Sequence, residues 1–215
     1  MGSHAKGTIH FGPFEVTTQV FLTTPHSFAV VNLKPLLPGH VLVCPKTPHK
    51  RLTDLTPPEL TDLFSAVQRV QRMLAQHYFT PSLPDSKQAT PPSTDSGSFN
   101  IAIQDGIEAG QTVPHLHVHV IPRIRGSTSK NPETDGDALY ESMAAEPGNV
   151  GGALWDRELK SRPEAGGAFP RIEDQDRMAR SMGEMEAEAD VFKKVLASMD
   201  DGAGVVNGDG PNSAS

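Results

Sequence analysis

The sequence predicts an α+β domain in which an antiparallel sheet of about five strands carries one packed helix and a C-terminal helix. Three observations lead to this fold class. Short β-rich runs are separated by turn residues, one long stretch repeats its apolar residues with the helical period, and one segment alternates strictly between histidine and aliphatic residues. The 215 residues are enough for one sizeable hydrophobic core with appendages.

The first strands of the sheet are predicted from three β-rich runs near the start of the chain. These runs cover residues 19–23, 27–32 and 40–45, and turn residues at Pro25 and in the segment 34–39 separate them. Short strands with tight connections are typical of antiparallel pairing. We therefore expect these three runs to be neighbours in one sheet.

Residues 56–79 are predicted to form the clearest helix. Thr56 is a good N-cap residue, Pro57 suits the first helical position, and Glu59 completes a Thr-x-x-Glu capping box. We expect its apolar face to cover one face of the sheet. That face would consist of Leu60, Leu63, Phe64, Val67, Val70 and Leu74.

Residues 80–98 are predicted to be a flexible insertion between the helix and the next strand, 99–104. The insertion is rich in proline and serine and has few apolar side chains. Such a segment cannot bury enough surface to offset its ordering entropy. A lid over a substrate is the alternative, but the insertion lacks the aromatic anchors that a lid needs.

The C-terminal part is predicted to be an appendage. Residues 144–172 are rich in glycine and proline and are expected to be an irregular linker, and 173–199 are expected to be a helix. The apolar side chains on one face of this helix would pack on the domain or on a second subunit, or form an adaptable binding face. This apolar stripe consists of Met178, Met182, Met185, Ala189, Phe192 and Leu196. Disordered ends are expected over 1–10 and 200–215, which leaves 11–143 as the domain.

Charge is divided unevenly along the chain. The whole chain has a net charge of −7, but residues 1–126 have 10 Lys and Arg against 8 Asp and Glu, and residues 127–215 have 9 against 18. All nine histidines lie at or before His119. The acidic balance argues against a nucleic-acid partner. The first part is the one that would tolerate an anionic ligand.

The expected environment is intracellular. The single cysteine, Cys44, excludes an intramolecular disulfide, which favours a reducing compartment. No apolar run approaches the roughly 20 residues that span a bilayer, and no signal-peptide pattern opens the chain. We therefore expect a soluble protein with no membrane partner.

The segment 115–121 is predicted to be a strand with two different faces. Leu116, Val118 and Val120 would point into the core. The histidines at 115, 117 and 119 would line the opposite face, with alternate Cα atoms about 6.5–7 Å apart. Crowding three imidazoles is costly, because protonation of more than one brings like charges together. The pattern therefore indicates a functional site.

Two chemistries could use such a row of imidazoles. Zinc requires its ligands in a tetrahedron, whereas three positions along one strand converge only if the strand bends strongly, and no second Cys/His cluster is present. Nucleophilic catalysis requires only one neutral imidazole, and the middle residue, His117, is flanked by two hydrogen-bonding neighbours. The segment before the row offers donors for an anion. It contains Gly110, Gln111, Thr112 and Val113.

The heptapeptide His115-Leu-His-Val-His-Val-Ile resembles the signature of the histidine triad (HIT) family of nucleotide hydrolases and transferases. The segments 32–45, 104–113 and 185–189, together with Tyr140, are similar to the fragile histidine triad branch. The resemblance implies a HIT-like fold, a homodimer, and hydrolysis of dinucleoside polyphosphates, preferentially diadenosine triphosphate. No tightly bound cofactor is implied, although Mg²⁺ or Mn²⁺ could assist on the polyphosphate. The expected location is the cytoplasm, with the nucleus as a second compartment.

The resemblance also implies a role for each matching residue. His117 would attack the α-phosphate, expel ADP and carry AMP until water releases it. His119 would contact the phosphate and the leaving oxygen, and His115 and His40 would position the other two. The implied substrate contacts are Asn32, Gln104, Gly110, Gln111, Thr112, Val113, His119 and Tyr140. From the residues alone, a turn role for Asn32 and a capping role for His40 are the alternatives.

Two other functions stay open at this point. The complete triad favours hydrolysis over nucleotidyl transfer, because the related transferases have glutamine in the position that flanks the nucleophile. A nucleoside phosphoramidase of the same family is the closest enzymatic alternative. A dinucleotide-binding signalling protein with slow turnover would need the same residues.

Overall fold

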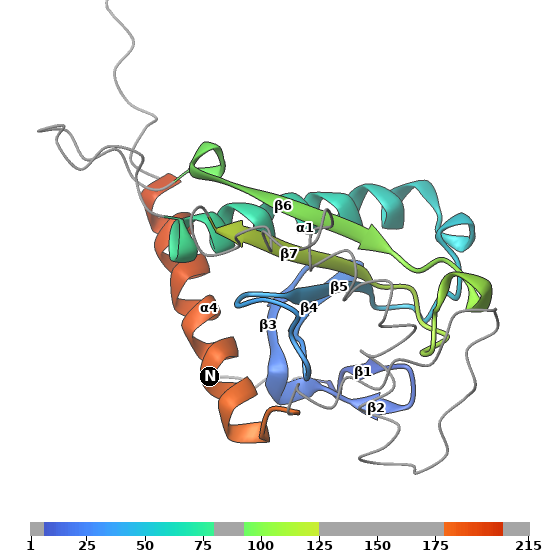
Figure 1. Ribbon diagram of the computed structural model, residues 1–215. Coiled ribbons are helices and arrows are strands. Elements are labelled where there is room, and N and C mark those ends of the chain that lie inside the picture. The colour runs from blue at the N-terminus through green and yellow to red at the C-terminus, as the bar shows by residue number, and fades with distance from the viewer. Residues whose placement is uncertain (1–6, 80–92, 125–178, 204–215) are drawn as a thin grey trace, which may run out of the picture.

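The computed structural model describes residues 7–79, 93–124 and 179–203. Its centre is a five-stranded antiparallel sheet with the strand order β3-β4-β5-β7-β6 (Figure 1). The strands are β3 (Val20–Thr23), β4 (Ser27–Val31), β5 (Val41–Pro45), β6 (Gly97–Ile103) and β7 (Val118–Ile124). With two helices packed on this sheet, the predicted α+β class is confirmed.

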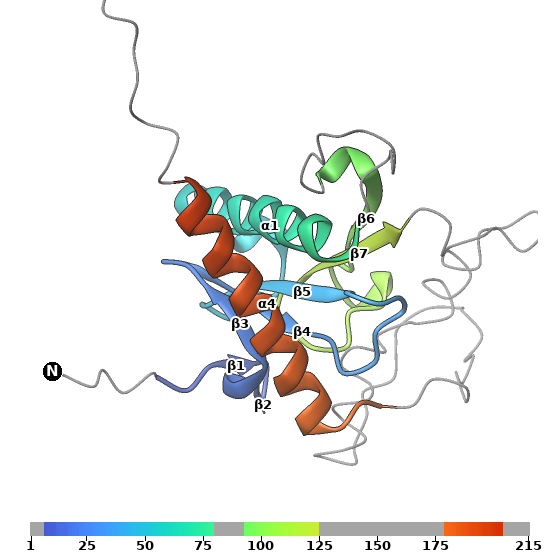
Figure 2. The same ribbon diagram turned by 90° about the vertical axis from the view of Figure 1, so that its left-hand side faces the viewer.

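The two helices are α1 (Pro57–Tyr78) and α4 (Met182–Ala203). Helix α1 packs on β4, β5 and β7, and α4 packs on β3, on β4 and across α1 (Figure 2). Two elements were not predicted, the short hairpin strands β1 (His10–Phe11) and β2 (Phe14–Glu15). Short 3₁₀ turns connect the rest: η1 (Thr17–Gln19), η2 (Leu52–Asp54), η3 (Thr94–Ser96) and η4 (Ile107–Ala109). Of the described residues, no helix is both long and apolar enough to cross a membrane.

Helix α1 begins as its sequence predicts. The Glu59 carboxylate accepts hydrogen bonds from the Thr56 main-chain N–H at 3.0 Å and from the Thr56 hydroxyl at 2.7 Å. The predicted apolar face is wrong at two positions, because Leu60 and Phe64 are 39% and 38% exposed. Because α1 packs against three strands, the side of the helix that is buried differs from the predicted one. Alanine and methionine side chains are buried in place of Leu60 and Phe64. The buried residues are Leu63, Ala66, Val67, Val70, Met73, Leu74 and Ala75.

Helix α4 begins at Met182, later than the predicted start at residue 173. Residues 179–181 are not helical, because a second capping box sets the start. The Ser181 main-chain N–H donates to the Glu184 carboxylate at 2.7 Å, and the Glu184 N–H donates to the Ser181 hydroxyl at 3.3 Å. Met182 is 40% exposed. The stripe residues Met185, Ala189, Phe192 and Leu196 are buried as predicted, and Met178 lies outside the described residues.

Strand β6 begins before the predicted end of the flexible insertion. Thr94–Ser96 forms a 3₁₀ turn, and β6 starts at Gly97, which pairs with Ile124. A β-carbon at position 97 would lie 2.5 Å from the ring of Phe79, so glycine lets the strand pass close to the end of α1. The last part of the predicted insertion is therefore part of the sheet. Its residues 80–92 and the predicted linker 144–172 lie outside the described residues.

The other predicted boundaries need small corrections. Gln19 belongs to η1, Asn32 follows β4 and His40 precedes β5. The ladder of β7 begins only at Val118, because the Leu116 N–H donates instead to the main-chain oxygen of His49 at 2.7 Å. Both predicted disordered ends are wrong at their inner boundary: the first strand starts at His10, before residue 11, and helix α4 continues past the predicted end at 199 to Ala203, because Asp200 pairs with Arg69.

Candidate active site

Four buried histidines form the centre of the candidate site. His115 and His117 lie just before β7, His119 lies within it, and His40 lies just before β5. Their exposed fractions are 1%, 3%, 7% and 0%, in that order. The pairing of β5 with β7 places His119 opposite Leu42 and so brings His40 to it. The aliphatic residues that alternate with the row, Leu116, Val118 and Val120, are fully buried as predicted.

His115 is an anchor, because the protein main chain occupies both of its ring nitrogens. The Gly12 N–H donates to Nδ1 at 3.0 Å, and Nε2 donates to the Pro45 oxygen at 2.7 Å. The rings of Phe11 and Phe28 pack against it. Burial, above all, lowers the pKa of His115. Main-chain groups thus hold His115 in place from both sides of its ring.

His117 is held as a neutral imidazole with a defined tautomer. Its Nδ1–H donates to the main-chain oxygen of His115 at 2.8 Å, which leaves the lone pair on Nε2. Burial, the largest cause, lowers the pKa of His117 to about 4. The edge of the ring meets Phe11 in a T-shaped contact at 5.1 Å. A neutral ring with a free basic nitrogen is the form that a nucleophile needs at neutral pH.

His40 and His119 form a hydrogen-bonded pair, called here the His40–His119 pair. The Leu36 N–H donates to His40 Nδ1 at 3.1 Å, so the proton of His40 is on Nε2. That Nε2–H points at His119 Nδ1, 2.9 Å away, which puts the proton of His119 on Nε2. This Nε2 is buried and has no hydrogen-bond partner among the described residues. Burial first, and then His117 and His40, hold the pKa of His119 well below its usual value.

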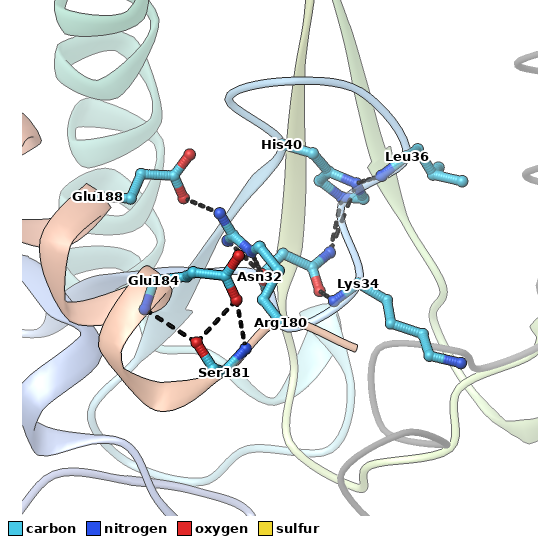
Figure 3. Close-up of polar contacts among 8 residues, drawn as sticks. All are labelled: Asn32, Lys34, Leu36, His40, Arg180, Ser181, Glu184 and Glu188. Carbon is cyan, nitrogen blue, oxygen red and sulfur yellow. Dashed lines mark hydrogen bonds and ion pairs between the residues drawn. The ribbon is translucent and has the colours of Figure 1, made fainter. Parts of the chain in front are cut away.

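Asn32 lies against His40 (Figure 3). Its Oδ1 accepts the Lys34 N–H at 3.1 Å, and its Nδ2 lies 3.4 Å from His40 Nδ1 and 3.3 Å from His40 Nε2. The side chain is 1% exposed. The structure therefore shows Asn32 as a residue that orients His40, and its contact with a ribose stays a prediction.

The predicted phosphate-binding segment leads directly into the histidines. Gly110 adopts a left-handed conformation with φ +88°, and Gln111, Thr112 and Val113 are buried. The Gln111 side chain uses one amide hydrogen for the Lys50 oxygen at 2.8 Å. The His115 N–H donates to the Val113 oxygen at 2.7 Å. The segment is thus joined to the site, and its contacts with an anion stay a prediction.

Gln104 and Tyr140 are the two remaining predicted substrate contacts. Gln104 follows β6 directly and is partly exposed, and Tyr140 lies outside the described residues. Asp105, next to Gln104, fixes this end of the segment by accepting the Leu52 N–H at 2.9 Å and pairing with Arg51 at 3.3 Å. The contacts of Asp105 could not be predicted from the sequence. The same holds for the contacts that Phe11 and the Leu36 N–H make with the histidines, because only the folded chain brings these groups together.

The buried histidines predict a pH dependence of stability. In the unfolded chain a histidine gains a proton below its ordinary pKa of 6.5, whereas folded His117 stays neutral down to about pH 4. The unfolded state therefore binds more protons in this window, and the free energy of unfolding should fall as the pH is lowered through it. His117 alone corresponds to roughly 3 kcal/mol, because one pKa unit is about 1.4 kcal/mol.

Denaturant titrations between neutral pH and about pH 4 measure this effect. The His117→Asn variant should lose less stability across the window than the wild type. His26→Asn, which removes an exposed histidine, should match the wild type. Equal slopes for all three proteins would contradict the burial of His117 as a neutral ring.

Several known proteins are similar to this chain. The family model described as "HIT domain" matches residues 13–126. The chain is 39% identical over 191 residues to the bis(5'-nucleosyl)-tetraphosphatase [asymmetrical] of Schizosaccharomyces pombe, a match that covers 86% of this chain and 92% of the relative. It is 36% identical to the bifunctional bis(5'-adenosyl)-triphosphatase/adenylylsulfatase FHIT of Arabidopsis thaliana, with 86% and 83% covered.

Solved structures show the same fold. The NitFhit protein of Caenorhabditis elegans matches with a TM-score of 0.55 and 31% identity over 90% of this chain and 31% of that chain. The diadenosine triphosphate hydrolase of Plasmodium falciparum, solved with cyclomarin A, matches with a TM-score of 0.55 and 26% identity over 92% and 88%.

Proposed function

Because the chain belongs to the histidine triad (HIT) domain family, we propose that it hydrolyses dinucleoside polyphosphates, preferentially diadenosine triphosphate to AMP and ADP. Relatives that match most of the chain are named as hydrolases of such phosphoric anhydrides. The observation that carries the proposal is the pair of tautomers in the site. His117 offers a lone pair on Nε2, and His119 offers a proton on its own Nε2.

The two nitrogens support a two-step reaction. In the first step His117 Nε2 attacks the α-phosphorus, a P–N bond forms, and the P–O bond to ADP breaks with its electron pair going to the departing oxygen. His119 Nε2–H donates a hydrogen bond to that oxygen and stabilises its negative charge. In the second step the oxygen of a water molecule attacks the same phosphorus, the P–N bond to His117 Nε2 breaks, AMP leaves, and the surplus proton passes to solvent. Both imidazoles end as they began.

The substrate would be held by the residues around these two nitrogens. Main-chain N–H groups of the segment 110–113 are suited to the polyphosphate, since successive N–H groups in a turn bind anions. Asn32 would bind a ribose, and Gln104 and Tyr140 would contact the rest of the dinucleotide. Mg²⁺ or Mn²⁺ could assist on the polyphosphate, without a dedicated protein site.

A homodimer and a cytoplasmic location, with the nucleus as a second compartment, complete the proposal. Strand β6 is an edge of the sheet, and its Ile101 is 40% exposed. An edge strand with an exposed apolar side chain is suited to pairing with a second sheet. Leu60 and Phe64 on α1 are further exposed apolar residues that a second subunit could cover.

The function is tested with a panel of substrates in ¹⁸O-labelled water. Diadenosine triphosphate should be hydrolysed with a higher kcat/KM than diadenosine tetraphosphate or adenosine phosphoramidate, and the label should appear in AMP and not in ADP. A clear preference for the phosphoramidate would replace the proposal with a phosphoramidase. Tight binding of the dinucleotide with turnover too slow for metabolism would instead favour the signalling role.

A further inference from the structure

Arg180 connects the start of α4 to the turn that carries Asn32, although 148 residues separate the two in sequence. Its Nε donates to the main-chain oxygen of Asn32 at 3.1 Å, and one Nη group donates to the same oxygen. Its own main-chain N–H donates to the Leu33 oxygen at 3.0 Å. Figure 3 shows the guanidinium between this turn and the first turns of the helix.

The other side of the guanidinium is held by α4. The second Nη group donates to the Glu188 carboxylate at 2.7 Å, and the two side chains are only 19% and 18% exposed. Burial and the neighbouring Glu188 carboxylate raise the pKa of Tyr78 to about 12, so the Tyr78 hydroxyl stays protonated and donates to Glu188. Partial burial of a paired charge with several donors gives it a fixed geometry.

Asn32 links Arg180 to the histidines of the site. Its main-chain oxygen accepts from Arg180, while its side chain contacts the ring of His40. His40 in turn determines which nitrogen of His119 holds the proton. Tyr78 supports the same region, since a β-carbon on Gly39, next to His40, would lie 2.5 Å from its ring. One continuous set of contacts therefore runs from α4 to His119 Nε2.

We propose that Arg180 is a positioning residue for the reaction, which holds the turn at Asn32 so that the His40–His119 pair can donate the His119 Nε2–H hydrogen bond to the leaving oxygen. This inference rests on the proposed function. Arginine is suited to the role because one planar guanidinium donates to the carbonyl and the carboxylate together, whereas a lysine ammonium lacks this forked geometry.

A purely structural role would be to attach α4. The helix has its own hydrophobic anchors, however, since Met185, Ala189 and Phe192 are fully buried and the Phe192 ring meets Phe21 at 5.2 Å. Loss of Arg180 should therefore leave α4 docked and displace the hydrogen-bond donor, His119 Nε2–H. This difference makes the two roles separable by experiment.

The test is the Arg180→Ala variant of the full chain. We expect kcat for diadenosine triphosphate to fall roughly 10- to 100-fold with KM nearly unchanged, because a small displacement of a catalytic group has effects of this size. Aryl esters of AMP then distinguish the mechanism. The loss should be larger for esters of weakly acidic phenols, whose departing oxygen is more basic and gains more from the hydrogen bond, than for esters of strongly acidic phenols.

Three further variants complete the design. Arg69→Ala removes an exposed ion pair between α1 and α4, the 2.6 Å contact with Asp200, and should keep wild-type kinetics. Arg180→Lys should recover only part of the rate. Should Arg180→Ala fail to fold, as judged by circular dichroism, Glu188→Gln weakens the same guanidinium contact and should show the same dependence on the leaving group.

The outcomes separate the inference from the proposed function. Equal losses for all esters, or no loss of kcat, would overturn the role of Arg180 while the wild type still hydrolyses the dinucleotide. Absence of hydrolysis by the wild type and by Arg69→Ala would refute the proposed function itself. A loss in His119→Ala that is equal for all leaving groups would show that another group stabilises the leaving oxygen, and would overturn the role of Arg180 through His119.

Discussion

Replacement of His117 by asparagine is expected to lower turnover of diadenosine triphosphate by about 10⁴-fold or more while the substrate still binds. The asparagine amide can keep the hydrogen bond that His117 Nδ1 makes to the His115 oxygen, but it has no basic nitrogen to attack phosphorus. The chain should therefore stay folded and bind the dinucleotide. Steady-state kinetics and equilibrium dialysis measure the two quantities separately.

The prediction for His117 can also be tested by detecting the covalent intermediate. Wild-type enzyme quenched during turnover should carry the mass of an AMP group on the peptide that contains His117, and the asparagine variant should not. His26→Asn, a change at an exposed histidine, is the matched control and should be labelled like the wild type. A label on another peptide, or rapid hydrolysis with no label, would count against His117 as the nucleophile.

Replacement of His119 by alanine is expected to have the second largest effect, with a loss that depends on the leaving group. Loss of one hydrogen-bond donor to a developing oxyanion typically costs about 10²- to 10³-fold, and the upper part of this range is expected for the more basic leaving groups. Esters of AMP with strongly acidic phenols should lose much less in the first step. Stopped-flow detection of phenol release measures that step alone.

His40 provides the internal check on this prediction. Since His40 acts on the reaction through His119 Nδ1, the effects of His40→Ala and His119→Ala should not add in the double variant. Full additivity would mean that His40 contacts the substrate independently. The mechanism of the His40–His119 pair would then have to be revised.

Much of the fold and the centre of the site could be predicted from local sequence. The capping box at Thr56 and the alternation from His115 onward specify a helix start and a two-faced segment through contacts between near neighbours. His117 as the nucleophile candidate followed from the same row. The buried helix face was wrong at Leu60 and Phe64 because strands distant in sequence decide which side of a helix is covered.

The supporting contacts could not be predicted, for a physical reason. The Leu36 N–H is a main-chain group that every residue except proline has, so no pattern marks it as the group that sets the tautomer of His40. The function of His115 as an anchor likewise depends on Gly12, which is 103 residues away. Only tertiary packing brings such groups within hydrogen-bond distance.

The contact between Arg180 and Asn32 also has a consequence for the order of folding. It closes a loop of 148 residues, and contacts between segments so far apart form late because the entropy of loop closure must be overcome first. The sheet can pair and helix α1 can dock before the start of α4 reaches the turn. During refolding, the secondary structure should therefore return before the enzymatic activity. Activity would appear only when the last tertiary contacts have formed.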